Sequence, residues 1–246
     1  MLENLKAVGV GTEHIPILKG VPTGIAMITV GDNDNTIIVV PGANGKVDRA
    51  YIDSIKSELE KFDMVVLQHE IPLETVHYVI EFCYEKGIKI VLNPAPAAAV
   101  PMEIIDKVTY VTPNEHEAVL IFGDELSTED LLRKYPEKLV ITQGSRGVST
   151  CLKDGQILNV PARKAQVVDT TGAGDTLNGA FSVQIAEGKA IEDALAYANV
   201  AASLSTEKFG AQTGMPTAEE VETALKILNG ESVEKEIPVE MELITK

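Results

Sequence analysis

Residues 64–92 read MVVLQHEIPLETVHYVIEFCYEKGIKIVL, and this stretch indicates the class of fold. Its first four residues, MVVL, predict a buried strand. Residues 73–86 then place apolar side chains at helical spacing, and Gly87 follows them as a residue that commonly ends a helix. Residues 88–92, IKIVL, predict a second strand. A strand, a helix and a strand in this order are typical of two parallel strands joined by a crossover helix.

The same alternation of strands and helices continues after residue 92. Residues 110–111 and 139–142 predict further short strands, and residues 115–122 predict a helix between them. We therefore expect an α/β fold, a mostly parallel sheet in a three-layer α/β/α arrangement. In such sheets ligands bind beyond the carboxyl ends of the strands, so the polar residues that follow these strands are the candidates for a site.

Two regions depart from this alternation. Residues 23–40 contain two strand-like runs around GDNDN, which predicts a hairpin that forms a small β flap. Residues 148–168 contain two more strand-like runs around Lys153-Asp154-Gly155, and the later strand is expected to end near Val168. We expect residues 1–230 to form one α/β domain and the charged residues 231–246 to form a C-terminal tail.

Composition excludes several classes of protein. The net charge is −16, from 37 acidic and 21 basic residues, so nucleic acid and anionic membranes would be repelled. No apolar run reaches the length of about 20 residues that a membrane helix needs, and the first residues lack the pattern of a secretory signal. Cys83 and Cys151 show no disulfide or metal-ligand pattern and are interpreted as packing residues. A cytoplasmic location is the default expectation.

Residues 168–180, VDTTGAGDTLNGA, carry the strongest chemical signal. Gly172, Ala173 and Gly174 allow a tight turn into a helix, and their backbone N–H groups can converge on one point as an anion hole. Asp175 follows in the first helical turn. An aspartate there can simply cap the helix. Beside an anion hole, however, a carboxylate can act as the base that an acceptor hydroxyl needs, and we favour that interpretation.

Other candidate residues are ambiguous by themselves. Asn114 to Glu117 follow a strand and open a helix, so they can cap that helix or place a carboxylate near phosphate groups. Asp169 can cap a turn or bind a cation. Arg146 can be a solvated surface charge, and Asn199 is a polar helix residue. His69 and His77 show no metal or triad pattern and are interpreted as surface or packing histidines.

Several segments together resemble the ribokinase family of carbohydrate kinases. The segment DTTGAGDTLNGA is similar to the family signature, and four further segments match in family order: NPAP at 93–96, TPNEHE at 112–117, TQGSRG at 142–147 and GAQ at 210–212. The resemblance covers almost the whole chain. It implies a ribokinase-like fold and the transfer of the γ-phosphate of ATP to D-ribose, at O5.

The resemblance also implies roles for individual residues. Asp175 would deprotonate the sugar hydroxyl and contact the sugar, while Gly172, Ala173 and Gly174 would hold the transferring phosphoryl group. Glu117 would order Mg²⁺ together with Asn114, and Glu70 would contact the sugar. Residues expected to line the nucleotide are Asn114, Glu117, Thr142, Gln143, Gly144, Ser145, Arg146, Gly147, Gly174 and, beside the adenine, Asn199.

A monovalent cation, K⁺, is the third group that the resemblance implies. One half of its site would be Asp169 and Thr171. The other half would come largely from backbone carbonyl groups in the loop that contains Ser205, Lys208, Gly210 and Gly214. The resemblance further implies a homodimer for a full-length relative, because the flap of the family pairs across subunits.

The match to the family is incomplete on the sugar side. The family's first strand carries an asparagine and an aspartate that hold the sugar, followed by a Gly-Gly segment, and no counterpart of either is found here. We therefore expect these 246 residues by themselves to phosphorylate ribose poorly or not at all. The alternatives are a kinase for another sugar or a nucleoside, and a nucleotide-binding remnant without catalytic activity. A structural protein that binds no nucleotide would leave the GAGD turn unexplained.

Overall fold

The computed structural model describes residues 1–31 and 34–231. Contacts within the chain divide it into two compact units, residues 1–159 and 160–246, and each unit is described by itself. The expected single domain over residues 1–230 stays a prediction. Apart from Glu231, the expected tail at 231–246 lies outside the described residues.

The first unit begins with a short helix and the predicted hairpin. Helix α1 (Leu2–Ala7) buries none of its residues. Strands β1 (Ile25–Gly31) and β2 (Asp34–Val40) pair antiparallel, with Ile25 opposite Val40 and Gly31 opposite Asp34. The 3₁₀ helix η1 (Gly42–Lys46) and helix α2 (Arg49–Leu59) follow. The hairpin expected from residues 23–40 is therefore confirmed.

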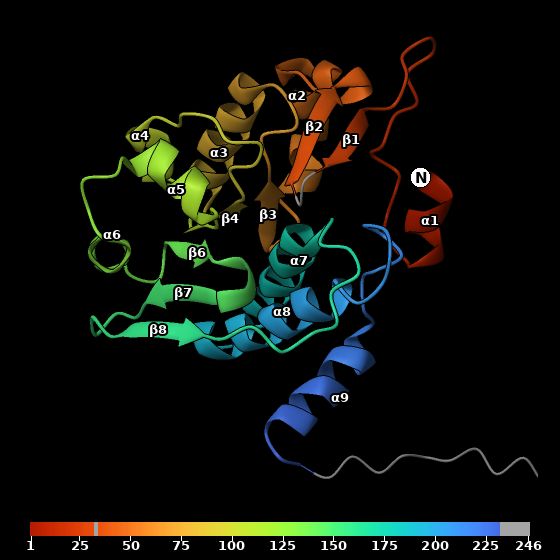
Figure 1. Cartoon of the computed structure of the whole chain (residues 1–246). Helices are drawn as coiled ribbons and strands as arrows, with labels where there is room; N and C mark the ends of the chain where they lie inside the picture. The colour runs from red at the N-terminus through yellow and green to blue at the C-terminus, as the bar shows by residue number, and fades with distance from the viewer. Residues whose placement is uncertain (32–33, 232–246) are drawn as a thin grey trace, which may run out of the picture. The chain divides into compact units, whose positions relative to one another are not determined.

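A parallel sheet forms the centre of the first unit (Figure 1). Strands β3 (Met64–Leu67), β4 (Lys89–Leu92) and β5 (Tyr110–Val111) pair in parallel in the order β3-β4-β5. The crossovers contain helices α3 (Leu73–Lys86) and α4 (Met102–Ile105), and Gly87 ends α3 with a left-handed φ of 72°. The predicted β-α-β alternation is confirmed, and so is the α/β class.

Parallel bridges extend this sheet toward an antiparallel part. Val111 bridges Leu139, and Asn114 bridges Thr142, beside strand β6 (Val140–Thr142). Strand β6 pairs antiparallel with β7 (Val148–Cys151), and β8 (Ile157–Val160) lies on the other side of β7. The connections hold helices α5 (Glu115–Phe122) and α6 (Thr128–Lys134) and the 3₁₀ helix η2 (Gly144–Arg146).

The strand that the sequence predicted to end near Val168 ends earlier in the structure. The second strand of the 148–168 region ends at Val160, and residues 161–170 form neither helix nor strand. Proline at position 161 has no N–H to donate to a sheet. The backbone N–H groups of Val168 and Asp169 instead donate to the carbonyl oxygen of Thr206, at 2.8 and 3.1 Å. The apolar pair Val167-Val168 is exposed and not part of a sheet.

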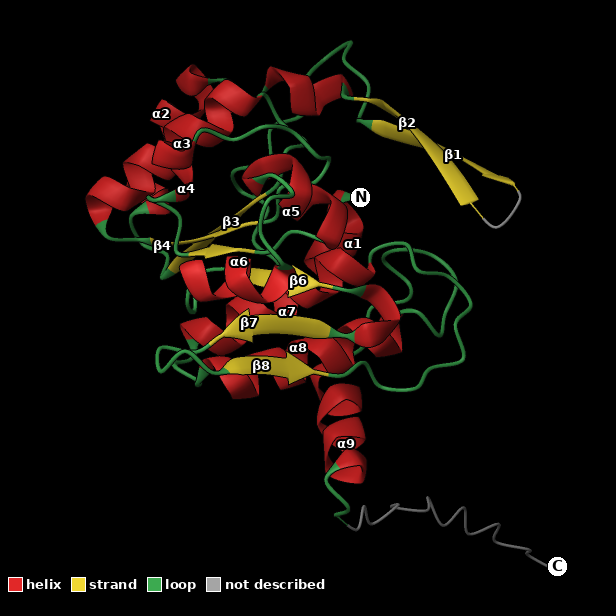
Figure 2. Cartoon of the chain, turned by 60° about the vertical axis from the view of Figure 1, so that its left-hand side comes forward, coloured by secondary structure: helices red, strands yellow, loops and turns green. Residues whose placement is uncertain are grey.

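The core of the first unit lies between the parallel sheet and helices α2, α3 and α4, which cover one face of it (Figure 2). Helix α3 contributes Val76, Ile80 and Cys83, which are fully buried against β4. Burial raises the pKa of the Cys83 thiol to about 11, so it stays protonated and unreactive at neutral pH. Cys151 is buried as well. Both cysteines are packing residues, as the sequence predicted.

The described part of the second unit, residues 160–231, contains three helices and the segments that join them. Helices α7 (Ala173–Ala186) and α8 (Ile191–Ser205) pack side by side. Alanines at 194, 198 and 201 of α8 are buried, which allows close approach of the neighbouring helices. Helix α9 (Ala218–Leu228) packs on α8 through Val221 and Ala224. None of the helices in the described part of the chain is long and apolar enough to cross a membrane.

Candidate active site

The turn before helix α7 places the GAGD sequence at the N-terminus of that helix. Gly172 adopts a left-handed φ of 81°, and a Cβ atom there would lie 3.1 Å from the carbonyl oxygen of Ala211. Only glycine fits this combination of conformation and close approach. Thr176 and Asn178 donate side-chain hydrogen bonds of 2.9 Å to the carbonyl oxygens of Gly172 and Gly174, which fix the first turn from inside the unit.

The backbone N–H groups of this turn are available to an anion. Among the described residues, none accepts a hydrogen bond from the N–H of Gly174 or of Asp175. The first N–H groups of a helix have no partner within it, and the helix dipole adds positive potential at the same place. The N–H groups of Gly174 and Asp175 are therefore free donors of the kind an anion hole requires, whereas the N–H of Ala173 donates to the Thr170 carbonyl at 3.2 Å. The anion hole expected at Gly172, Ala173 and Gly174 stays a prediction.

Asp175 is exposed in the first turn of α7. Its carboxylate receives no hydrogen bond from the residues that the structure describes, and the residue before the helix, Gly172, has no side chain to cap it. An N-cap aspartate would lie before the first helical residue and accept from the N–H two or three residues on. Asp175 is already inside α7, so the capping alternative does not describe its position.

A second group of polar atoms lies beside this turn in the same unit. The Asp169 carboxylate accepts hydrogen bonds of 2.9 Å from the N–H groups of Thr171 and Gly210. Hydrogen bonds from the side chain and backbone of Thr171, and then from the backbone of Gly210, hold the pKa of Asp169 below its ordinary value. Asp169 is thus an anion at neutral pH that joins the start of the GAGD turn to the loop after α8.

Carbonyl oxygens of that loop converge around Gly214. A Cβ atom added to buried Gly214 would lie 2.6, 2.9 and 3.5 Å from the carbonyl oxygens of Ser205, Gly210 and Lys208. Several carbonyl oxygens directed at one region can replace the hydration shell of a monovalent cation. The residues named for K⁺ thus fit such an ion: the structure brings together these carbonyl groups with Asp169, which is hydrogen-bonded to Gly210.

The first unit contains the Asn114–Glu117 pair at the N-terminus of α5. The two residues form a reciprocal capping box: Asn114 Oδ1 accepts from the Glu117 N–H at 2.8 Å, and Glu117 Oε2 accepts from the Asn114 N–H at 2.8 Å. Glu117 is buried, which raises its pKa, while the Asn114 hydrogen bond opposes that rise. The capping alternative is therefore correct as a description of local structure, and it leaves Glu117 Oε1 without a hydrogen bond from the described residues.

Few side chains in the described residues are placed to bind a divalent cation. No group of three or more His, Cys, Asp or Glu side chains that could hold a metal ion occurs among the described residues. A single carboxylate such as Glu117 still fits Mg²⁺, because this ion keeps several waters and usually binds one or two carboxylates together with nucleotide phosphates. The protein would thus supply few of the ligands itself.

Strand β6 ends at Thr142, and residues 143–147 turn sharply after it. Thr142 donates its N–H to the Pro113 carbonyl at 2.9 Å, and Gln143 donates its N–H to the Gly147 carbonyl at 2.8 Å, which closes a loop around Gly144 and Ser145. This turn therefore lies next to the start of α5. Arg146 forms an exposed ion pair with Glu115 of α5, and its contact with the nucleotide stays a prediction.

Asn199 occupies an interior position in the second unit. Its side chain is 5% exposed and donates its amide hydrogens to the carbonyl oxygens of Val160 and Pro161, at 3.2 and 2.8 Å. A contact with adenine stays a prediction. The sequence contained no signal for this structural role, because the partners are backbone atoms almost forty residues away.

Glu70 is exposed in the loop after β3, where the sequence placed the sugar contact. The preceding residue, His69, is buried, and its Nδ1 atom lies 3.2 Å from the Pro96 carbonyl oxygen. Asn93 donates a hydrogen bond of 3.0 Å to the Thr112 carbonyl, joining the loops after β4 and β5. The buried position of His69 agrees with its interpretation as a surface or packing histidine. The structural role of Asn93 was not predicted, and its place directly after strand β4 was the signal that could have identified it.

Comparison with known proteins identifies the class. The model of the pfkB family of carbohydrate kinases matches residues 1–218, and the chain therefore belongs to this family. Within it, the chain is 49% identical to the ribokinase of Bacillus subtilis over 225 residues, 92% of this chain and 76% of that protein.

Solved structures agree with this assignment. The ribokinase of Thermotoga maritima superposes with a TM-score of 0.79 at 35% identity, covering 92% of this chain and 76% of that one. The Arabidopsis thaliana ribokinase complexed with ribose and ATP superposes with a TM-score of 0.75 at 30% identity, covering 84% and 70%. The ribokinase-like fold expected from the sequence is confirmed.

Proposed function

We propose that the chain transfers the γ-phosphate of ATP to a hydroxyl group of D-ribose, at O5, and releases ADP and ribose 5-phosphate. The 49% identity to a ribokinase over 92% of the chain is the observation that carries this proposal. The Arabidopsis relative, whose structure holds ribose and ATP, supports the same pair of substrates. The GAGD turn with its free N–H groups supplies the chemistry that such a transfer needs.

Asp175 is proposed as the general base. Its carboxylate takes the proton from the ribose hydroxyl while that oxygen forms a bond to the γ-phosphorus, and the bond from this phosphorus to the ADP oxygen breaks. An exposed carboxylate without hydrogen bonds from the described residues is free to accept that proton. The N–H groups of Gly174 and Asp175, with the turn at Gly172 and Ala173, stabilise the negative charge that develops on the transferring group.

The nucleotide is proposed to bind near Asn114, Glu117 and the turn at 142–147. Mg²⁺, when bound to the nucleotide phosphates, neutralises their charge, and Glu117 would hold it through the carboxylate oxygen that the capping box leaves free. The main-chain turn around Gly144 lets a flat ligand approach closely. Asn199 is proposed to face the adenine side, and Ser145, Gly147, Gln143 and Thr142 complete the lining.

K⁺ is proposed to bind between Asp169, Thr171 and the carbonyl oxygens of the 205–214 loop. The convergence of the Ser205, Lys208 and Gly210 carbonyl groups around Gly214 supports this site. When bound, the cation supplies positive potential next to the GAGD turn, and its ligands fix the peptide groups of that turn. The described residues contribute the carbonyl groups and one carboxylate.

Glu70 is proposed to contact the sugar, and a homodimer formed through the β1–β2 hairpin is proposed as the assembly. Several side chains of the hairpin are apolar and about half exposed, Ile25, Met27 and Ile38 among them, which supports a protein partner for this flap.

The identity of the acceptor can be tested by direct detection of the product. Purified protein with Mg-ATP and K⁺ would be incubated with ribose, deoxyribose, fructose or a nucleoside, and the phosphate esters followed by ³¹P NMR. We expect the highest kcat/KM with ribose and a phosphate ester at O5. Faster turnover of another acceptor would replace ribose as the substrate but keep the kinase class. The absence of any phosphate ester, with ATP binding retained, would favour the nucleotide-binding remnant.

A further inference from the structure

Residues 161–172 lead from strand β8 to helix α7 and form neither helix nor strand up to the turn at 171–172. This segment carries Asp169, so its position depends on side-chain and loop contacts. Its start is held by Asn199, which donates to the carbonyl groups of Val160 and Pro161. The rest of the segment is held by the loop that follows α8.

Two consecutive residues of that loop make most of the contacts. The Thr206 carbonyl oxygen accepts from the N–H groups of Val168 and Asp169. Glu207 Oε1 accepts from Arg163 Nη1 at 2.9 Å and from the Gln166 N–H at 3.4 Å. Glu207 therefore reaches the middle of the segment, and Thr206 reaches its end. Backbone contacts at Thr206 occur whatever its side chain is, whereas the contact at Glu207 depends on this particular side chain.

The Arg163–Glu207 ion pair is less exposed to water than the Lys208–Glu220 ion pair. The side chains of Arg163 and Glu207 are 24% and 28% exposed, whereas those of Lys208 and Glu220, the other ion pair of the second unit's described part, are 51% and 46% exposed. A partly buried pair is screened less by salt and holds its two side chains more firmly. The Arg163–Glu207 pair is thus the stronger side-chain link between the segment and the loop.

The two connected parts are the two halves of the cation site. The segment supplies Asp169, and the loop supplies the carbonyl oxygens of Ser205, Lys208 and Gly210 that converge around Gly214. Glu207 lies within this run of carbonyl groups, one residue before Lys208. A change in how Glu207 holds Arg163 would shift the loop carbonyls relative to the Asp169 carboxylate.

We propose that Glu207, through its ion pair with Arg163, is a positioning residue that sets the spacing of the cation site and thereby its affinity for K⁺. This inference rests on the cation site of the proposed function. Glu207 contacts Arg163 and Gln166 and is not among the residues proposed to hold the substrate or the nucleotide, so its loss should change the affinity for K⁺ alone. The affinity for K⁺ would fall when the link is lost, while turnover at saturating K⁺ would stay close to that of the wild-type protein.

The test measures the Tm of the nucleotide-free protein at a series of K⁺ concentrations, with the ionic strength held constant by choline chloride. We expect K⁺ to raise the Tm of the wild-type protein along a saturable curve. In Glu207→Gln and Arg163→Met the midpoint of that curve should rise about fivefold, the loss expected for one partly buried ion pair. The charge-swapped double variant, Glu207→Arg with Arg163→Glu, should recover part of the affinity.

A matched control separates positioning from general electrostatics. Glu219 lines the same hollow of about 560 Å³ as Arg163 and Glu207, but it forms no ion pair with a described residue. Glu219→Gln removes the same charge and should leave the K⁺ midpoint unchanged. A second readout is the K⁺ dependence of ADP release, whose midpoint should shift in parallel while kcat at saturating K⁺ and the KM for ATP change less than twofold.

The possible results distinguish a failure of the proposed role of Glu207 from a failure of the cation site on which that role depends. A wild-type Tm that does not respond to K⁺ would overturn the cation site and the inference together. A normal response of the wild type with the same midpoint in Glu207→Gln would overturn the inference alone. An equal shift in Glu219→Gln would also overturn it, because the effect would then come from charge and not from the link to Arg163.

Discussion

Glu117 shows how one side chain can serve both local structure and a site. Its carboxylate closes the capping box with Asn114, and its burial raises its pKa above the ordinary value. A carboxyl group whose pKa is raised on folding favours the folded state at low pH, and this contribution is lost as the pH rises through the folded pKa. At neutral pH the buried charge therefore costs stability, which is the pattern expected where a charge is kept for a ligand.

The variant Glu117→Gln tests this balance. The amide oxygen of glutamine can still accept the Asn114 N–H, so the free energy of unfolding at pH 7 should stay the same or rise by up to about 1 kcal/mol. The kcat/KM for Mg-ATP should fall by about tenfold or more if the proposed role holds, because the carboxylate proposed to bind Mg²⁺ is lost. Glu115→Gln, on the exposed face of the same turn, is the control and should change kcat/KM less. Normal activity of Glu117→Gln would reduce Glu117 to a capping residue.

The buried His69 should make the free energy of unfolding depend on pH. Burial lowers its pKa, and its Nε2 atom is buried without a hydrogen-bond partner among the described residues. The unfolded chain thus takes up this proton at a higher pH than the folded protein does. The contribution of His69 to stability is fully present above about pH 6.5 and is lost as the pH falls below that value.

We expect the free energy of unfolding of the wild-type protein to fall as the pH drops below about 6.5, with a slope of up to about 1.4 kcal/mol per pH unit from this group. In His69→Leu the slope in this window should be smaller, whatever the constant offset from the lost contact with Pro96. Urea unfolding at a series of pH values measures both proteins, and equal slopes in the wild type and His69→Leu would contradict the prediction.

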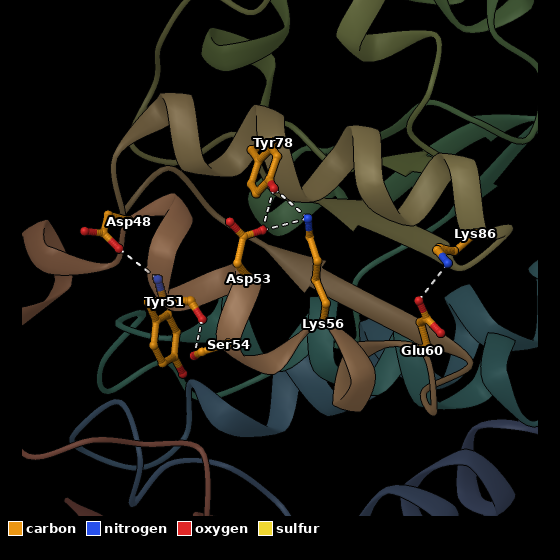
Figure 3. A network of polar contacts seen from close by, with 8 residues as sticks. All are labelled: Asp48, Tyr51, Asp53, Ser54, Lys56, Glu60, Tyr78 and Lys86. Carbon is orange, nitrogen blue, oxygen red and sulfur yellow. Dashed lines mark hydrogen bonds and ion pairs between the residues drawn. The ribbon is translucent and has the colours of Figure 1, made fainter.

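At the scale of elements, helices α2 and α3 are joined by a polar network on the surface of the first unit (Figure 3). The Tyr78 hydroxyl donates to Asp53 and accepts from Lys56, both at 2.6 Å, and Lys56 Nζ lies 2.7 Å from Asp53. Lys56 also lies over the ring of Tyr78, 4.6 Å from its centroid. The lysine lowers the pKa of Asp53, so the carboxylate stays charged. One tyrosine of α3 thus holds two side chains of α2.

The variant Tyr78→Phe keeps the ring and removes the hydroxyl. It should lower the Tm by about 1–3 °C, because two hydrogen bonds between the helices are lost while the cation–π contact remains. Tyr84→Phe is the matched control: Tyr84 lies on the same helix, is 58% exposed and forms no hydrogen bond with a described residue. Differential scanning calorimetry compares the two, and an equal effect of both substitutions would show that the network adds nothing.

The elements also show what periodicity can predict. Helix α3 and strands β3 and β4 were predicted almost to the residue, because each is an apolar run bounded by Gly, Pro or a charged residue. The strand expected near Val168 was wrong because the exposed pair Val167-Val168 resembles a strand in composition. Its backbone partner is the Thr206 carbonyl, 38 residues away, and nothing in the local pattern indicates such a contact.

The site was predictable where a motif fixes local geometry and not where it depends on distant partners. The GAGD turn and the Asn114–Glu117 pair lie at helix N-termini, as their spacing indicated. The interior position of Asn199 and the pairing of Arg146 with Glu115 depend on long-range packing and could not be derived from the sequence. For the same reason the link between Glu207 and Arg163 became visible only in the structure.

At the scale of the whole molecule, the negative net charge is compatible with the binding of an anionic nucleotide. The net charge of −16 disfavours nucleic acid and anionic membranes, yet an anionic nucleotide can bind where N–H groups and cations supply local positive potential. Both units contain such a place: the N-terminus of α5 in the first and the GAGD turn with its neighbouring carbonyl cluster in the second. The family assignment agrees with a protein that binds ATP as its phosphoryl donor.

The most direct test is ADP release with Mg-ATP and K⁺, with and without ribose, by the wild-type protein, Asp175→Asn and the control Asp193→Asn. Asp193 also lies in the first turn of a helix, α8, so it matches the loss of charge at a helix N-terminus. We predict ribose-dependent release by the wild type and by Asp193→Asn, at a low rate because the family's sugar-holding first strand has no counterpart in these residues. For Asp175→Asn we predict a further loss of about 10²–10⁴-fold in kcat with ATP binding retained. Release that does not depend on ribose, or that survives Asp175→Asn, would contradict the assignment of Asp175 as the base of a ribose kinase.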